Sequence, residues 1–141
     1  MKCRDFMVGD WCRNEHGTPM QIIDVGEEAY AACKEHNGCA WAFSDVEGFE
    51  PHPIEITEDI LRKNKWKVKG YTLHPSEHYC VKDEGINHLL WSYGILSIFL
   101  DYEKDDDRMF PDIVIPVKYV HQLQQVLRIA GMTDMANNFK V

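Results

Sequence analysis

One segment of the chain carries cysteine and histidine side chains at a spacing that could bind a metal ion. The segment CKEHNGC places three such side chains close together: Cys33, His36 and Cys39. Zinc takes four ligands of this kind in a tetrahedron, and its cysteines most often form C-x2-C pairs. Here five residues separate the two cysteines. We therefore favour a polar turn with reduced, buried thiols, and a zinc site remains the alternative.

Motifs that support other chemistry are absent from the sequence. It contains no G-x-S-x-G elbow for a nucleophilic serine and no glycine-rich loop of the kind that binds phosphate. The acidic run at residues 101–107 resembles a calcium loop in charge only, because Asp106 stands where an EF-hand loop needs glycine. The sequence thus predicts a charged turn there, no catalytic residue and no cofactor.

Residues 119–131, YVHQLQQVLRIAG, form the clearest helical pattern in the chain. At about 100° per residue, five apolar side chains fall on one stripe: Val120, Leu123, Val126, Leu127 and Ala130. Gly131 follows and can take the left-handed conformation that often ends a helix. We expect the stripe to pack onto a β-sheet.

The opposite side of this helix gathers His121, Gln124, Gln125 and Arg128. A catalytic histidine needs a partner that orients it, and neither Gln125 nor Arg128 is a carboxylate that could do so. We therefore expect a solvated face. Glutamine and arginine make adaptable hydrogen bonds, so these four residues are the candidate docking face for another protein.

The sequence pattern predicts β-strands in the first third of the chain. Strand patterns cover residues 5–13, 18–25, 30–33 and 39–43, with turn residues between them and a bulge expected near Ile23 and Asp24. Short strands at this spacing predict a small SH3-like β-barrel or a curled sheet over residues 1–54.

The remainder predicts antiparallel strands with two helices over residues 55–141. Thr57 is a good N-cap for a short middle helix. Strands are expected at residues 71–73, 78–82 and 112–116, with two more across 86–102. The fold class is therefore α+β, either as two subdomains, 1–54 and 55–141, or as one continuous domain, 1–141.

Composition bounds the partners and the compartment. The 141 residues carry a formal charge of −8, which repels nucleic acid and anionic lipid. No apolar stretch reaches the roughly 20 residues of a membrane helix. Five cysteines without framework spacing, and an N-terminus unlike a signal peptide, are typical of a reduced cytoplasmic protein. The pattern says nothing about the oligomeric state.

Three blocks of the sequence resemble a recognisable group of proteins. The blocks are FMVGDWCRNEHGTPMQIIDV, IEITEDILRKNKW and YVHQLQQVLRIAGM. In this order they resemble short proteins of unknown activity that are encoded in prophages and other mobile elements of gut anaerobic bacteria. The resemblance implies a host or phage protein as the partner, and it implies no catalytic or binding residues. The first block also resembles SH3-like barrels, in which a GD turn precedes a strand.

Two classes of function follow from these observations. The first is a non-enzymatic protein-interaction or regulatory module, favoured by the negative charge and the many aromatic residues. The second is a small metal-binding protein or enzyme that uses some of the seven histidines and five cysteines. We favour the first.

Overall fold

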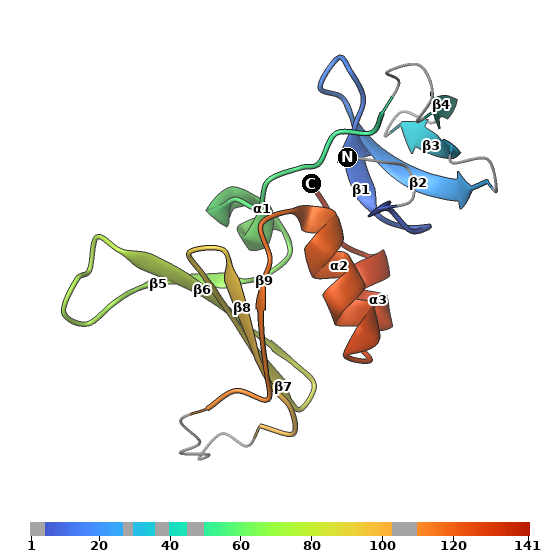
Figure 1. The fold of residues 1–141 in the computed structure, drawn as a ribbon. Coiled ribbons are helices and arrows are strands. Elements are labelled where there is room, and N and C mark those ends of the chain that lie inside the picture. The colour runs from blue at the N-terminus through green and yellow to red at the C-terminus, as the bar shows by residue number, and fades with distance from the viewer. Residues whose placement is uncertain (1–4, 27–29, 36–39, 45–49, 103–109) are drawn as a thin grey trace. The chain divides into compact units, whose positions relative to one another are not determined.

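The computed structural model describes residues 5–26, 30–35, 40–44, 50–102 and 110–141, with the backbone alone at 30–35, 40, 41 and 44. The chain divides into two compact units. Unit 1 comprises residues 1–55, 119–139 and 141, and unit 2 comprises residues 56–118 and 140. The C-terminal helices thus belong to the same unit as the N-terminal strands (Figure 1).

Unit 1 contains an antiparallel sheet in the order β1-β2-β3-β4. Its strands are β1 (Trp11–Arg13), β2 (Pro19–Val25), β3 (Tyr30–Glu35) and β4 (Ala40–Ser44). The pairing of β2 with β3 shifts between Ile22 and Asp24, which confirms the predicted bulge. The sheet order is open, and the described residues form no closed barrel. The barrel alternative is therefore wrong, because β1 and β4 are the two ends of this order.

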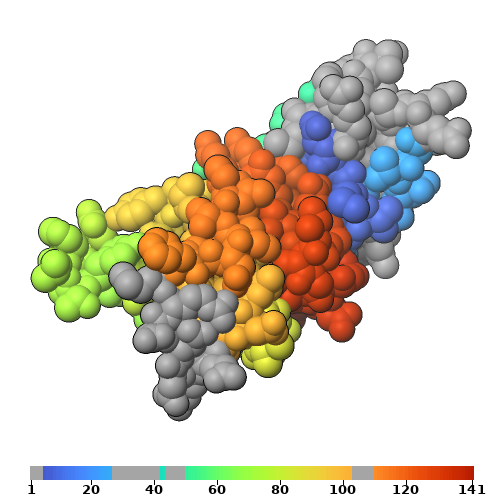
Figure 2. All heavy atoms as spheres, turned by 60° about the horizontal axis from the view of Figure 1, so that its bottom comes forward, coloured from blue at the N-terminus to red at the C-terminus, as the bar shows by residue number. Residues whose placement is uncertain are grey.

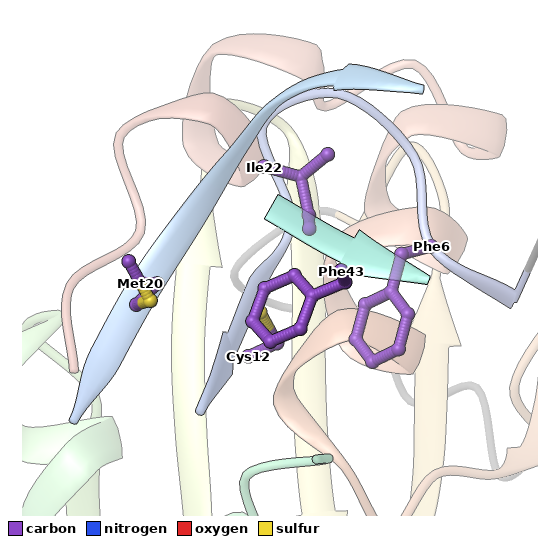
Figure 3. Close-up of a cluster of buried hydrophobic side chains, with 5 residues drawn as sticks. All are labelled: Phe6, Cys12, Met20, Ile22 and Phe43. Atoms are coloured by element: carbon purple, nitrogen blue, oxygen red, sulfur yellow. The ribbon is translucent and has the colours of Figure 1, made fainter. Parts of the chain in front are cut away.

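A small apolar core lies on one face of this sheet. Alternate residues of β2, Met20 and Ile22, point to the same face and are buried. They cluster with Phe6, Cys12 and Phe43, which come from the N-terminal segment, β1 and β4 (Figure 3). The core thus joins the N-terminal segment to strands β1, β2 and β4.

Two helices complete unit 1: α2 (Val120–Ile129) and α3 (Thr133–Asn137). Val120, Leu123 and Leu127 are fully buried, as the predicted apolar stripe requires. The helix also ends as predicted. Gly131 has φ +85°, and the amide of Met132 donates to the carbonyl of Leu127 at 2.8 Å, which satisfies the last turn in the Schellman manner.

Unit 2 is an antiparallel meander with one short helix. Helix α1 (Glu58–Lys63) begins at Thr57, whose hydroxyl accepts from the amide of Ile60 at 3.2 Å, as the sequence predicts. The five strands pair in chain order: β5 (Lys67–Gly70), β6 (His78–Glu84), β7 (Asn87–Ser92), β8 (Ile95–Phe99) and β9 (Ile113–Pro116). The whole chain is therefore mixed α+β.

The faces of the unit 2 sheet follow the period-two pattern. Leu96 and Ile98 alternate onto the buried face together with Leu89, and all three are inaccessible to solvent. The strand predicted at residues 71–73 is wrong. The first strand lies instead at Lys67–Gly70. It is an edge strand with exposed lysines, so it lacks the apolar alternation by which a strand is recognised in a sequence.

Among the described helices, none has both the length and the apolar character needed to cross a bilayer.

Candidate functional site

A buried carboxylate in the turn before β1 organises the polar residues of unit 1. Asp10 is inaccessible to solvent. Its Oδ2 accepts from the amide of Met7 at 2.8 Å and from Nε2 of Gln125 at 2.7 Å. Its Oδ1 accepts from Nη1 of Arg128, whose Nε also donates to Oδ1 of Asn137 at 3.2 Å. The charge of Asp10 is thus balanced inside the unit.

Glycine at position 9 is what allows this turn to approach α2. Its φ is +93°, a conformation that disfavours any residue with a Cβ. A Cβ atom there would lie 2.9 Å from Nη2 of Arg128. The amide of Gly9 donates to the carbonyl of Ile22 at 2.8 Å, which fixes the turn against β2. The Gly-Asp pair therefore serves a close helix contact as well as a turn.

Gln124 is the best-satisfied polar side chain in this region. Its Oε1 accepts from the amide of Trp11 at 2.9 Å. Its Nε2 donates to the carbonyls of Gly9 and Ala136, each at 2.9 Å. The side chain is inaccessible to solvent. Both amide hydrogens and the oxygen are in use, so Gln124 joins the β1 turn to α2 and α3.

His121 lies among aromatic rings and is only 2% exposed. Its ring centroid is 4.5 Å from that of Phe6 and 5.9 Å from that of Tyr119. Burial lowers the pKa of His121 from its ordinary value, although the carboxylates of Asp10 and Asp5 oppose this effect. Within the described residues, Nδ1 has no hydrogen-bond partner. The imidazole is therefore held neutral at pH 7, without a partner that would make it a general base.

These contacts correct the expectation of a solvated helix face. His121 and Gln124 are buried, while Gln125 and Arg128 both bind Asp10. The residues of this face are polar, but the turn before β1 in the same unit covers them. Gln124, Gln125 and Arg128 make their hydrogen bonds within the chain, so a partner could reach them only by displacing that turn.

The cysteine-histidine segment falls largely outside what the structure describes. Of the residues Cys33, His36 and Cys39, only the backbone of Cys33 is described, as part of β3. No group of three or more histidine, cysteine, aspartate or glutamate side chains with metal-binding geometry occurs among the described residues. The zinc prediction is thus untested at this segment.

A carboxylate–histidine pair joins the paired strands β6 and β7 of unit 2. Nδ1 of His88 is 2.6 Å from Oδ1 of Asp83 across the β6–β7 pairing, and the imidazole stacks 4.9 Å from the ring of Tyr102. Such a carboxylate could orient a catalytic imidazole. The next cross-strand neighbour of His88 is Phe99, whose ring cannot act as a nucleophile. We interpret this pair as a cross-strand contact that stabilises the hairpin.

Unit 2 contains an open groove that we call the Tyr93 groove. It consists of two hollows that share Glu77 and Tyr93, with volumes of about 370 and about 400 Å³. The first hollow is lined also by Tyr71, Leu73 and His74, and the second by Glu58, His78 and Trp91. Figure 2 shows the light green atoms near β5 and β6 beside the yellow atoms of β7 and β8 on one face.

Tyr93 occupies a backbone position that suits it poorly. Ser92 pairs with Ile95, so Tyr93 and Gly94 form a two-residue hairpin loop, and both have positive φ, +50° and +75°. Turns of this type favour Asn-Gly, because a bulky side chain in the left-handed region is strained. The tyrosine side chain is also 69% exposed. Backbone strain at an exposed residue is typical of a functional site, where the side chain contacts a ligand or partner.

The walls of the groove are held by contacts within unit 2. Nε1 of Trp91 donates to the carbonyl of Val117 at 2.9 Å. The hydroxyls of Tyr71 and Ser92 are hydrogen-bonded at 2.6 Å, and the Tyr71 ring packs 4.8 Å from that of Tyr79. Two of the aromatic walls are therefore fixed before any ligand arrives, which lowers the entropic cost of binding.

The charged groups of the groove, apart from its two histidines, are the carboxylates of Glu58 and Glu77. Oε1 of Glu58 is 3.0 Å from Nδ1 of His78. The loss of solvent around its hydroxyl and the neighbouring Glu77 carboxylate raise the pKa of Tyr93 above its ordinary value. The lining residues of the two hollows include no lysine or arginine. The groove can therefore offer aromatic faces and negative charge to a ligand.

Comparison of the chain with protein-family models, with curated proteins and with solved structures finds no match in any of the three. These comparisons therefore supply no argument for function.

The Tyr93 groove was missed by sequence reasoning, although one local signal points to it. The segment SYGI stands between two alternating strand patterns, and its glycine marks a tight turn. A tyrosine before that glycine, where asparagine is favoured, is the unusual feature. The remaining wall residues come from the start of α1 and the residues before it, from the β5–β6 turn and from strands β6 and β7, and the sequence does not show that these segments meet.

Proposed function

We propose that this protein is a non-enzymatic protein-interaction module and that the Tyr93 groove binds an extended segment of another protein. The observation that carries the proposal is the exposed Tyr93 ring, held in a strained turn and shared by both hollows. A tyrosine with no binding role would not retain this backbone strain, because the strain lowers the stability of the turn.

The size and lining of the groove suit a peptide. Each hollow is at the lower end of the volume range for ligand sites, so each accommodates one side chain better than a whole cofactor. Tyrosine and tryptophan are also the side chains most enriched at protein interfaces, because they bury a large area at low entropic cost. Leu73, exposed at the rim, adds an apolar contact.

The class of partner follows from the sequence resemblance. Three blocks of the chain resemble proteins of prophages and mobile elements, and we propose a protein of the host or of the phage as the partner. The negative formal charge makes a nucleic-acid partner a poor alternative.

Peptide display tests the proposal. A library of random twelve-residue peptides is selected on the purified protein and then screened against the variant Tyr93→Asn. We expect peptides that bind the wild type and lose binding to the variant, because the ring is removed while the turn is retained. The matched control is Phe110→Ala, which removes an exposed aromatic side chain of unit 2 outside the groove. Selected peptides that bind Tyr93→Asn as well as the wild type would contradict the proposal.

A further inference from the structure

The charge of the Tyr93 groove is unevenly compensated. Glu58 contacts His78, and its second oxygen is 3.7 Å from Nη2 of Arg62. Glu77 is exposed, and among the ion pairs formed by the described residues none involves it. Glu77 therefore has no cationic partner among the described residues, its carboxylate interacts with the Tyr93 hydroxyl, and it lines both hollows.

Aromatic side chains line the same hollows as this carboxylate. Tyr93 lines both hollows with Glu77, Tyr71 lines the first and Trp91 the second. The negative face of an aromatic ring attracts a cation within about 6 Å of its centroid, and tryptophan and tyrosine do so more strongly than phenylalanine. A carboxylate next to two or three such rings is the combination that recognises a positively charged group.

We infer that the Tyr93 groove selects a cationic side chain, and that its occupant is an arginine-bearing segment of the partner protein. This inference rests on the proposed function and names the chemistry of the ligand. Charge complementarity supports it, because the chain carries −8 and the lining of the groove contains no lysine or arginine.

Arginine suits the groove better than lysine does. A guanidinium is planar, so it can stack on the Tyr93 ring while its N–H groups donate to the Glu77 carboxylate. It is also less strongly hydrated than an ammonium group, which lowers the cost of entering a groove with apolar walls. We therefore expect lysine to bind the same site more weakly.

A defined set of peptides tests the inference. The probes are acetylated, amidated pentapeptides Ala-Leu-X-Leu-Ala, in which X is arginine, lysine or citrulline; citrulline has the shape of arginine without its charge. Binding is measured by chemical-shift titration of the ¹⁵N-labelled full chain. We expect the arginine peptide to shift the amides of Glu77 and Tyr93 and to bind about tenfold more tightly than the citrulline peptide.

Two variants separate the carboxylate from the general charge of the protein. Glu77→Gln should remove the preference for arginine over citrulline. Glu84→Gln should keep that preference, because it removes the same charge from β6 at a partly exposed position outside the groove. Raising the salt concentration to about 1 M should weaken arginine binding more than citrulline binding, because the Debye length falls to about 3 Å.

Each outcome decides the inference. Equal affinity for arginine and citrulline, or an unchanged preference in Glu77→Gln, overturns it. So does an arginine peptide that shifts no amide of the groove. The proposed function is judged separately, because the display selection can still yield Tyr93-dependent peptides that carry no cation.

Discussion

The guanidinium of Arg128 and the carboxylate of Asp10 form an ion pair inside unit 1, although 118 positions separate them in the chain. The side chain of Arg128 is 13% exposed and that of Asp10 is inaccessible to solvent. The pair joins the turn before β1 to α2. Two segments from opposite ends of the chain, residues 6–25 and 119–132, therefore meet at this contact.

Removing Arg128 should destabilise unit 1 strongly. Arg128→Met leaves the Asp10 carboxylate buried without its cation, and such a change costs about 3–5 kcal/mol. The control is Arg62→Met, because Arg62 pairs with Glu58 and Asp59 at the surface, where a salt bridge contributes at most about 1 kcal/mol. Hydrogen exchange of the amides of α2 and α1 measures the two free energies of opening. Equal losses would contradict the assignment of a buried pair.

Adding one methyl group at Gly9 should cost more than adding it at Gly17. Both residues have positive φ, +93° and +81°, so an alanine at either position is strained by about 1–2 kcal/mol. Only at Gly9 does the new Cβ meet Arg128, which adds ~2 kcal/mol by disturbing a charged hydrogen bond. The difference between Gly9→Ala and Gly17→Ala in urea denaturation isolates that contact, and no difference would refute it.

The stability of unit 1 should fall as the pH drops below about 6.5, the ordinary pKa of histidine. Burial lowers the pKa of His121 in the folded state, so below pH 6.5 the unfolded chain binds a proton that the folded chain does not. The loss should level off below the folded pKa. NMR titration of the His121 ring measures that pKa directly, and a value above 6.5 would reverse the sign.

Replacing Tyr93 with asparagine should stabilise the protein while removing its binding. Asn-Gly is the favoured sequence for a hairpin loop with two positive φ angles, so Tyr93→Asn should gain about 1 kcal/mol. Thermal unfolding measures the gain, and the selected peptides measure the loss of affinity. Tyr93→Phe is the control, because it keeps both the ring and the strain. A variant that is less stable than the wild type would show that the Tyr93 ring supports the fold.

Several elements could be predicted from the sequence because their determinants are local. The apolar stripe of α2, its glycine end and the Thr57 cap all depend on residues within a few positions of one another. The bulge in β2 follows from the same kind of pattern. The strand at Lys67–Gly70 was missed because an edge strand with exposed lysines lacks the apolar alternation that identifies a buried one.

The polar face of α2 shows where local patterns stop. A helical periodicity separates the apolar side from the polar side, and it carries no information about what covers the polar side. Asp10 and the carbonyl of Gly9, which bind Arg128, Gln125 and Gln124, lie more than a hundred positions away. Only the tertiary structure shows that the polar face of α2 is covered by another segment of the chain.

The sequence by itself therefore determined the α+β class, the apolar stripe of α2 and the ends of α1 and α2, because these follow from short-range periodicity and capping. The tertiary structure decided that the polar face of α2 is buried and that Tyr93, Glu77 and Trp91 share a groove. Burial and convergence depend on contacts between segments distant in the chain. Those contacts form only when the whole unit folds, so no local pattern encodes them.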